Sequence, residues 1–421
     1  MNYVIIGNSA AAIGAVEGIR QVDKTNPIVL ISDEPYHTYS RPLISYYLAG
    51  KVAEDKMLYR KHDFYEKNKV TTMLGTKVVA VDTGNKEVVL ENDEKVPYDK
   101  LLIATGSVPF IPPMAGLDKN NVFTFIKMDD IKAIKEVVMV GNKAVIIGAG
   151  LIGLKAAEGL TNLGVDVTVV ELANRVLPAI LDEDAAGIVQ AHLEKQGIKF
   201  ELNTSVEAIT GSEKVEGVSL KNGKSYAADI VVVAVGVRPN TEIVKDSQIA
   251  VSRGIVINDY CQTSIDDVYA AGDVTEGYDI VYAQQRVLPI LPNAYNQGET
   301  AGLNMAGKIS IFNGGFAMNS IGFFGLPMIT AGIIKSEDEN YEVLVKSVPE
   351  QGYYKKIILK DNVVVGYIYL NKVDRAGIVT SLIKDKINVA DFKEVLLKDG
   401  FGYIDLPQEL RKSRLLRGGI A

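Results

Sequence analysis

Short apolar runs rich in β-branched residues recur along the first part of the chain, and each is followed by glycine or other small residues. Residues 4–6 and 145–147 are two such runs, and each leads through a glycine into a stretch typical of a helix. A second apolar run follows each stretch, at residues 28–31 and 167–170. Strand, tight turn, helix and strand make a βαβ unit, whose crossover implies a parallel sheet.

The two units repeat one another in order. Glu-Gly-Ile at residues 17–19 has the same offset as Glu-Gly-Leu at 158–160, and residues 99–106 are echoed by 229–236. A proline follows three residues after the last glycine of each copy. Three echoes in one order predict two dinucleotide-binding domains. The predicted fold class is α/β, with two Rossmann-like domains and a small α+β C-terminal domain.

The second unit carries a complete glycine motif directly after its first strand. Gly148, Gly150 and Gly153 satisfy G-x-G-x-x-G, in which the glycines allow a tight turn, close approach of a pyrophosphate, and helix–strand contact. Glu171 ends the second strand, where a carboxylate accepts hydrogen bonds from ribose hydroxyls and repels a 2′-phosphate. This favours NADH over NADPH, although Arg175 nearby is a group that accommodates such a phosphate.

The first unit departs from this motif. Gly7 is retained, but Ser9 and Ala12 stand where the second and third glycines belong. Serine still permits backbone approach, and a serine hydroxyl can itself bind phosphate. Asp33 and Glu34 follow the second strand, and both stay open as the ribose ligand, with Glu34 favoured.

Composition narrows the class of protein. The 421 residues are 47% hydrophobic and 23% charged, as in globular proteins of two or three domains, and the net charge of −7 excludes a general nucleic-acid surface. A basic cluster near the end is either a solvated helix end or a docking patch for an acidic partner; it comprises Arg411, Lys412, Arg414 and Arg417. Without a secretory signal or an apolar run of membrane-spanning length, we expect a cytoplasmic protein.

Cysteine and histidine content excludes several chemistries. Cys261 is the only cysteine, so the chain lacks a CxxC redox pair, an intrachain disulfide and a cysteine-ligated iron–sulfur or zinc site. The three histidines are scattered, and no metal site is expected.

The chain resembles the pyridine nucleotide–disulfide oxidoreductase superfamily of FAD proteins over residues 1–316. The resemblance rests on the glycine turn of each unit, the Ala-Thr-Gly turn at residues 104–106, and Tyr-Ala-Ala-Gly-Asp at 269–273. Within that superfamily, residues 36–50 and 287–295 are similar to NADH:rubredoxin oxidoreductases and to the N-terminal part of NAD(P)H-nitrite reductase large subunits.

The resemblance implies roles for particular residues. Asp273 would bond the ribityl chain of FAD, Arg41 would lie near its pyrophosphate, and a helix opening at Pro292 would face the isoalloxazine. The residues predicted to hold FAD are Gly7, Ser9, Ala10, Ala11, Asp33, Glu34, Arg41, Pro42, Ala104, Thr105, Gly106, Gly272, Asp273, Pro292 and Asn293. Those predicted to hold the nicotinamide nucleotide are Gly148, Gly150, Leu151, Ile152, Gly153, Glu171 and Gly236.

The resemblance also implies an order of domains. A discontinuous FAD domain would comprise residues 1–115 and 246–316, with an NAD domain at 116–245 and a C-terminal interface domain at 317–421. In the last, strand-like runs at residues 341–345, 356–359 and 363–370 precede a helical segment around 378–383, with an Asp-Asn hairpin turn between the second and third runs.

The predicted activity is electron transfer from NADH through FAD to a rubredoxin-type or iron–sulfur protein or partner subunit. Hydride transfer is the work of the cofactors, so no catalytic side chain is assigned. Lys51, Lys155 and Glu158 are either polar neighbours of the flavin or nicotinamide or plain surface charges. The alternatives are a nucleotide-binding subunit of a larger redox complex, an NADH oxidase that makes hydrogen peroxide, and a non-enzymatic NADH sensor.

Overall fold

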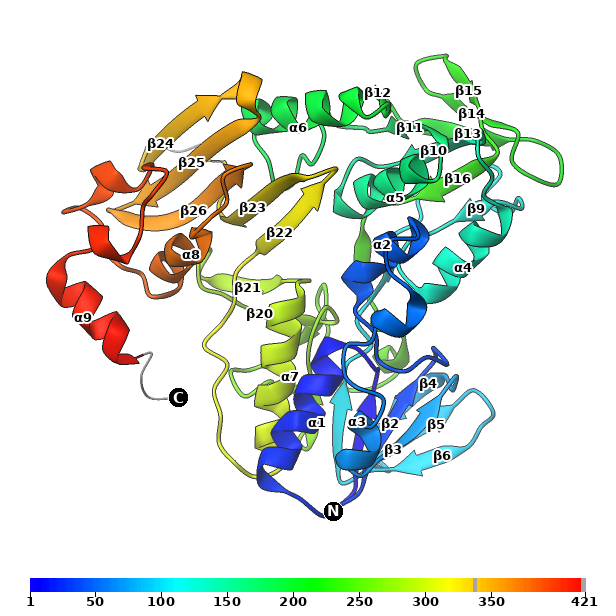
Figure 1. Ribbon diagram of the computed structural model, residues 1–421. Helices are drawn as coiled ribbons and strands as arrows, with labels where there is room; N and C mark the ends of the chain where they lie inside the picture. The colour runs from blue at the N-terminus through cyan, green and yellow to red at the C-terminus, as the bar shows by residue number, and fades with distance from the viewer. Residues whose placement is uncertain (336–338, 418–421) are drawn as a thin grey trace. The chain divides into compact units, whose positions relative to one another are not determined.

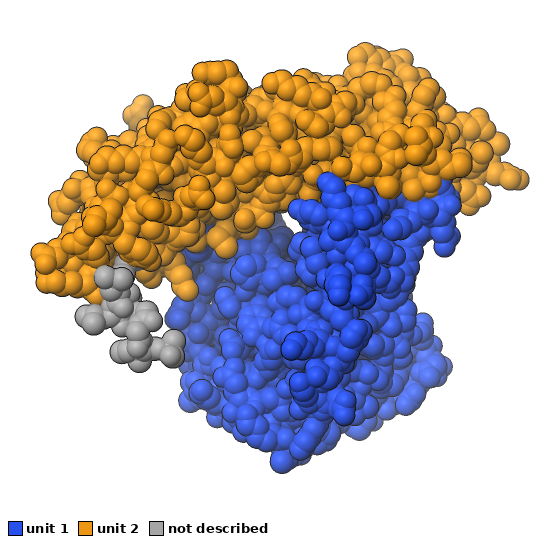
Figure 2. Space-filling model, in the orientation of Figure 1, with its two compact units in different colours: residues 1–112, 124–137, 235–317 blue, residues 113–123, 138–234, 318–421 orange. Residues whose placement is uncertain are grey.

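The computed structural model describes residues 1–335 and 339–417, the side chains of 413–417 excepted, and is shown in Figure 1. The chain forms two compact units, coloured separately in Figure 2. Unit 1 comprises Met1–Pro112, Thr124–Val137 and Val235–Ala317, and unit 2 comprises Pro113–Phe123, Val138–Ala234 and Met318–Ala421. Arg414 and Arg417 of the basic tail lie outside the described side chains.

Unit 1 is built on a five-stranded parallel sheet in the order β19-β7-β1-β2-β3. Its strands are β1 (Tyr3–Ile6), β2 (Ile28–Ser32), β3 (Val70–Leu74), β7 (Lys100–Ile103) and β19 (Val268–Ala270). Strands β1, β7 and β19 are buried along most of their length, as expected for a parallel sheet that is covered on both faces.

Three smaller sheets and five helices complete unit 1. The sheets contain β4 (Val78–Asp82), β5 (Glu87–Leu90) and β6 (Lys95–Pro97); β8 (Ser107–Pro109) with β17 (Val237–Pro239); and β18 (Ile255–Val256), β20 (Thr275–Asp279) and β21 (Gln284–Val287). The helices are α1 (Ala10–Val22), α2 (Ile44–Leu48), α3 (Phe64–Lys67), α4 (Met128–Val137) and α7 (Leu291–Met305).

Helices α1 and α7 lie side by side in unit 1 (Figure 1) and approach each other through glycines. A Cβ atom on Gly298 would lie 2.0 Å from the Ala11 carbonyl oxygen, and one on Gly302 would lie 2.3 Å from that of Ala15. Such distances are impossible for real side chains, so only glycine permits this contact. The contact brings the first turns of both helices together beside Gly272, in the loop after β19.

Unit 2 repeats the parallel arrangement with the strand order β12-β11-β10-β16-β9. The strands are β9 (Val122–Phe123), β10 (Lys143–Ile147), β11 (Asp166–Val170), β12 (Lys199–Glu201) and β16 (Ile230–Val233), and α5 (Leu151–Asn162) connects β10 to β11. Helix α6 (Glu183–Lys195) and the small sheet of β13 (Val206–Thr210), β14 (Gly217–Leu220) and β15 (Ser225–Ala227) complete this part. The two predicted βαβ units and their parallel sheets are confirmed.

The C-terminal part of unit 2 is a five-stranded antiparallel sheet in the order β22-β23-β26-β25-β24. Its strands are β22 (Met318–Phe323), β23 (Leu326–Gly332), β24 (Tyr341–Val348), β25 (Tyr353–Lys360) and β26 (Val363–Leu370), followed by α8 (Ala376–Lys384) and α9 (Gln408–Arg417). Asp361 and Asn362 form the hairpin turn between β25 and β26, both with positive φ, as expected for such a turn. All three predicted strands exist: β24 and β25 are longer than their apolar runs, and β26 has the predicted bounds.

Candidate cofactor sites

The turn after β1 brings a glycine against a neighbouring strand end. Gly7 has φ +117°, and a Cβ there would lie 2.1 Å from the Ala104 carbonyl oxygen. Ser9 is the N-cap of α1, and its hydroxyl makes no capping hydrogen bond, while Ala10 and Ala11 are buried in the first turn. The first turn of α1 therefore offers backbone N–H groups and a hydroxyl to an anion.

Asp33 and Glu34, the two acidic residues that are candidates for binding the ribose of FAD, lie in different surroundings. The side chain of Asp33 is 51% exposed, and it pairs with Lys127 at 2.6 Å. Glu34 is 5% exposed, accepts a hydrogen bond from the Tyr39 hydroxyl at 2.6 Å, and forms an ion pair with Arg41. Burial raises the pKa of Tyr39, so its hydroxyl stays protonated and donates to Glu34. The structure thus groups Glu34 with Arg41 and leaves Asp33 outside that group.

Asp273 lies in the loop after β19. Gly272 before it has φ +84°, and the Ser107 hydroxyl donates to the Asp273 carboxylate at 3.3 Å. Burial raises the pKa of Asp273, and the Ser107 hydrogen bond and the charge of Arg41 lower it by less. The Asp273 carboxyl group has a raised pKa and accepts a hydrogen bond from the Ser107 side chain. Such a group is a candidate for binding a hydroxyl group of a ligand.

The N-terminus of α7 lies beside that loop. Pro292 occupies its first turn, and Asn293 is 7% exposed, with an amide nitrogen that has no hydrogen-bond partner among the described residues. Gln297 accepts from the Gly272 backbone N–H at 2.8 Å and so fixes the Asp273 loop to α7. A buried amide without a partner is costly unless a ligand or water satisfies it.

The turn at residues 104–106 connects to a segment far along the chain. The Thr105 hydroxyl donates to the Asn240 carbonyl at 2.8 Å, and Gly106 has φ +67°. Strands β8 and β17, which follow Gly106 and Gly236, pair antiparallel with each other. Gly236 therefore belongs to unit 1, as this turn does, whereas the other residues predicted to bind the nicotinamide nucleotide belong to unit 2. Pro42 follows Arg41 in a short 3-10 turn, which comprises Arg41–Leu43.

The glycine turn of unit 2 has the geometry that its motif predicts. Gly148 has φ +107°, and a Cβ on Gly153 would lie 2.1 Å from the Gly148 carbonyl oxygen. Gly150 is the N-cap of α5, with open space where its Cβ would be, and Leu151 and Ile152 form the first turn. The open side at Gly150 is where a pyrophosphate would approach the backbone.

Glu171 and Arg175 have distinct environments. The Glu171 carboxylate accepts backbone N–H bonds from Ala149 at 2.7 Å and Ala173 at 2.8 Å, so it lies at the glycine turn. Arg175 is directed into its own loop, with a side chain 12% exposed. Its guanidinium donates to the carbonyls of Pro178 and Leu181, both at 3.3 Å, and to the Asn174 side chain at 2.9 Å.

Lys155 and Glu158 are buried, at 9% and 8% exposure, and are not surface charges. They form an ion pair on α5. Lys155 also donates to the Gly322 carbonyl at 3.2 Å, and Glu158 accepts from the Phe324 backbone N–H at 2.8 Å. Both side chains thus bind the hairpin of β22 and β23, whereas Lys51 is exposed.

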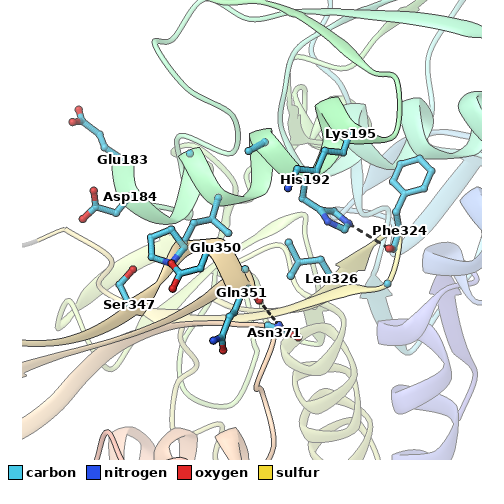
Figure 3. Close-up of a pocket in the computed structure, with 16 residues that line it drawn as sticks. Glu183, Asp184, His192, Lys195, Phe324, Leu326, Ser347, Glu350, Gln351 and Asn371 are labelled. Atoms are coloured by element: carbon cyan, nitrogen blue, oxygen red, sulfur yellow. Dashed lines mark hydrogen bonds between the residues drawn. The ribbon is translucent and has the colours of Figure 1, made fainter.

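An open cavity of about 800 Å³ lies in unit 2 between α6 and the turns of the C-terminal sheet (Figure 3). Glu183, Asp184 and Glu350 are among its lining residues, and His192 donates to the Phe323 and Phe324 carbonyls at its other end. None of the predicted site residues lines it.

The structure adds site neighbours that the sequence patterns do not single out. Tyr39, Ser107 and Gln297 each hold a predicted residue in place, through Glu34, Asp273 and Gly272 respectively. All three lie within or next to quoted motifs, so proximity to a motif is the signal that could have found them. Among the described residues, no cluster of three potential metal ligands occurs and no helix is long and apolar enough to cross a membrane.

Comparison with known proteins identifies the class. Residues 1–298 match the family described as pyridine nucleotide-disulphide oxidoreductase, and residues 318–387 match the rubredoxin NAD+ reductase C-terminal domain. The chain belongs to the pyridine nucleotide-disulphide oxidoreductase family, which implies FAD and NAD(P)H as cofactors.

Particular relatives refine this assignment. The nitrite reductase [NAD(P)H] of Bacillus subtilis (strain 168) is 36% identical over 394 residues, which are 93% of this chain and 48% of that protein. The chain therefore spans about half the length of this relative. The NADH-rubredoxin oxidoreductase of Clostridium acetobutylicum is 30% identical over 377 residues, 89% of this chain and 90% of that protein. The crystal structure of the covalent putidaredoxin reductase–putidaredoxin complex has a TM-score of 0.85 at 25% identity, covering 92% of this chain and 94% of that one.

Proposed function

We propose that this chain holds FAD in unit 1, accepts hydride from NADH bound in unit 2, and delivers electrons to a separate rubredoxin-type or iron–sulfur protein. The observation that carries the last step is the state of the only cysteine. Cys261 has no exposed surface, and burial raises the pKa of its thiol. A protonated, buried thiol is inert, so we infer that no redox-active cysteine lies between flavin and acceptor.

The residues of unit 1 fit FAD. The Ser9 hydroxyl and the first turn of α1 would bind its pyrophosphate, and Glu34, held by Arg41 and Tyr39, would bind the adenosine ribose. The Asp273 carboxyl would accept from the ribityl chain. When bound, FAD supplies hydride uptake from the nicotinamide and electron release to an acceptor.

The N-terminus of α7 would lie at the isoalloxazine. Its unpaired backbone N–H groups and partial positive charge would favour added negative charge there. The buried, unpartnered Asn293 amide nitrogen supplies a further donor.

Preference for NADH follows from the contrast between Glu171 and Arg175. Glu171 keeps a carboxylate at the glycine turn, where it would accept ribose hydroxyls and repel a 2′-phosphate. The donors of Arg175 are used by carbonyl and amide oxygens of its own loop, so they are not directed at the nucleotide.

An iron–sulfur or rubredoxin-type acceptor is supported by the C-terminal match and by the printed names of the relatives. The proposal also includes the domain order predicted from the sequence, with an FAD domain at residues 1–115 and 246–316, an NAD domain at 116–245 and a C-terminal domain at 317–421. The match to the C-terminal family begins at residue 318, close to the last of these boundaries.

The test is an anaerobic titration of the purified flavoprotein with NADH, followed by separate additions of rubredoxin, ferredoxin and oxygen. We expect flavin bleaching with NADH and fast recovery of absorbance with rubredoxin or ferredoxin. Rapid oxygen consumption without a protein acceptor would instead show an NADH oxidase, and slow bleaching without turnover would show a sensor. Turnover only in the presence of cluster-bearing subunits would show a component of a larger complex.

A variant tests the FAD site itself. Asp273→Ala removes a hydrogen bond to a carboxyl group, so we expect FAD to bind about 10- to 100-fold more weakly. Asp246→Ala, at an exposed position of unit 1, is the matched control and should retain FAD fully. Unchanged flavin content in the Asp273 variant would remove this residue from the site.

A further inference from the structure

Three lysine ammonium groups lie around the ring of Tyr353 in the C-terminal sheet. The Nζ atoms of Lys346, Lys355 and Lys372 lie 5.5, 5.9 and 5.3 Å from its centroid. Lys346 is on β24, Lys355 is on β25 and Lys372 follows β26, and these three strands are neighbours in the sheet (Figure 1). We call these three residues the lysine cluster.

The lysine cluster carries more positive charge than its own carboxylates balance. Lys346 and Lys355 are direct partners across β24 and β25, and like charges in such a pair destabilise a sheet. Asp399 accepts hydrogen bonds from Lys346 at 2.9 Å and from Lys372 at 3.0 Å, and these bonds lower its pKa and keep it ionised. Asp374 also lies near Lys355. Three ammonium groups therefore face two carboxylates.

Lys355 differs from the other two lysines in its surroundings. It is only 3% exposed, and its ammonium group donates no hydrogen bond to any of the described residues. Its neighbours are the rings of Tyr353 and of Tyr369, whose centroid is 4.8 Å from Nζ. Burial lowers the pKa of Lys355, because the charged form loses hydration there. A buried ammonium group without an acceptor is costly, and an anion beside it would remove that cost.

The exposure of the cluster favours a small anion. The side chains of Lys346 and Lys372 are 44% and 53% exposed, so solvent reaches the cluster on their side. Surface carboxylates of a folded partner protein would reach these two lysines but not the buried Lys355. A phosphate group is compact, doubly charged and has three acceptor oxygens, so it would accept hydrogen bonds from all three ammonium groups.

We propose that the lysine cluster is a binding site for a phosphate group, with Lys355 at its base and Lys346 and Lys372 at its rim. Inorganic phosphate and the phosphate group of a small metabolite share this chemistry. Asp399 would hold the two rim lysines in the empty site and release their donors to the ligand. None of these residues belongs to the sites proposed for FAD and NADH.

Isothermal titration calorimetry of the full FAD-loaded chain tests the proposal, with NAD+ in every solution and the ionic strength held constant with chloride. Sodium phosphate and glycerol 3-phosphate are titrated separately, because the first is a free anion and the second carries its phosphate group on a small metabolite. We expect saturable one-to-one binding of at least one of them, and the tighter ligand identifies the source. The readout is a heat of binding, so it does not depend on electron transfer.

Two variants change the site in opposite directions. Lys355→Met keeps the length of the side chain but removes the buried ammonium group, so binding should weaken by about tenfold or more. Asp399→Asn removes the carboxylate that competes for Lys346 and Lys372, so binding should tighten by about threefold or more. Lys360→Met, at the exposed end of β25, is the matched control and should bind as the wild type does.

Tighter binding cannot result from damage to the fold, so the Asp399 variant keeps the test decisive even where Lys355→Met fails to fold. Heats that never saturate, as ionic screening alone produces, would overturn the proposal. So would binding that Lys355→Met leaves unchanged or that Asp399→Asn weakens. If Lys355→Met raises only the KM for rubredoxin or ferredoxin, the cluster is part of the surface that binds the electron acceptor, and the phosphate proposal is wrong.

Discussion

Replacing Cys261 by alanine distinguishes the two ways in which electrons can leave a protein of this family. The thiol has no exposed surface and lies in the main apolar cluster of unit 1. Burial raises the pKa of the Cys261 thiol, and the negative charge of Asp259 raises it further by a smaller amount. The thiolate that sulfur chemistry requires therefore does not form. If electrons pass directly from flavin to acceptor, this sulfur serves only packing.

The size of the effect follows from that environment. Removing one buried sulfur atom leaves a small cavity, which costs about 1 kcal/mol and lowers the unfolding midpoint by about 2–4 °C. Electron transfer from NADH to a protein acceptor should stay within about twofold of the wild type, because no interaction with a reacting group is lost. A thiol relay would instead lose several orders of magnitude.

The assay is steady-state reduction of rubredoxin or ferredoxin by NADH, with the flavin content of each preparation measured first. Cys261→Ser is the control for the substitution itself. It keeps the side-chain shape but buries a hydroxyl, so we expect a stability loss of about 1–3 kcal/mol with turnover again unchanged. Loss of acceptor reduction in both variants, while NADH still bleaches the flavin at the normal rate, would refute the direct route.

Four further predictions address the nucleotide sites and the stability of the fold. Glu171→Ala should lower kcat/KM for NADH by about 10- to 100-fold and lower that for NADPH much less; an unchanged ratio would exclude the ribose role. Gly298→Ala places a methyl group against the Ala11 carbonyl and should cost about 1–3 kcal/mol and weaken FAD retention. Gly187→Ala in α6, where a Cβ meets nothing within 4 Å, should stabilise the folded protein by about 0.5–1 kcal/mol. Chemical denaturation measures the change in stability of the Gly298 and Gly187 variants. Burial raises the pKa of Asp273, so in flavin-free protein its contribution to stability is present in acid and lost as the pH rises through the folded pKa. Asp273→Asn should therefore become more stable than wild type from acid to neutral pH, and a constant difference in denaturation midpoint would contradict this.

The fold could be predicted wherever its signal is local. An apolar run followed by glycine fixes strand, turn and helix within a few residues, which is why both βαβ units were predictable. Of the three predicted C-terminal strands, β26 has the predicted bounds, whereas the other two were predicted too short. Strand β24 continues to Val348 and β25 begins at Tyr353, because strand pairing extends both beyond their apolar runs. Hydrogen bonds between backbones do not require apolar side chains, so the amino-acid composition does not show where these strands end.

The site was predictable as a set of motifs but not as a set of contacts. The choice between Asp33 and Glu34 depends on Arg41 and Lys127, which come from different segments. The glycines of α1 and α7 are visible in the sequence, yet nothing local shows that helices almost 280 residues apart meet. These features arise from tertiary packing, which outweighs local preference.

The two repeated helices, α1 and α5, show how one sequence pattern serves two different contacts. The third motif glycine is retained as Gly153 in α5, where a Cβ would strike the Gly148 carbonyl, whereas Ala12 takes its place in α1 and is fully buried. Helix α1 must therefore sit farther from its turn than α5 does. In exchange, α1 packs closely on α7 through its own glycines.

Glu17 and Glu158, which occupy equivalent positions of α1 and α5, also make different contacts in the two units. In unit 1, Glu17 accepts from the Tyr295 hydroxyl on α7 at 2.6 Å and from Arg60 at 2.7 Å. In unit 2, Glu158 binds the Phe324 backbone at the hairpin turn and pairs with Lys155, which stands at the offset of Gly14. The same helix face thus secures α7 in one copy and the C-terminal hairpin in the other. Since α7 presents its N-terminus to the proposed flavin site, the Glu17 carboxylate helps to position that site through its hydrogen bond with Tyr295.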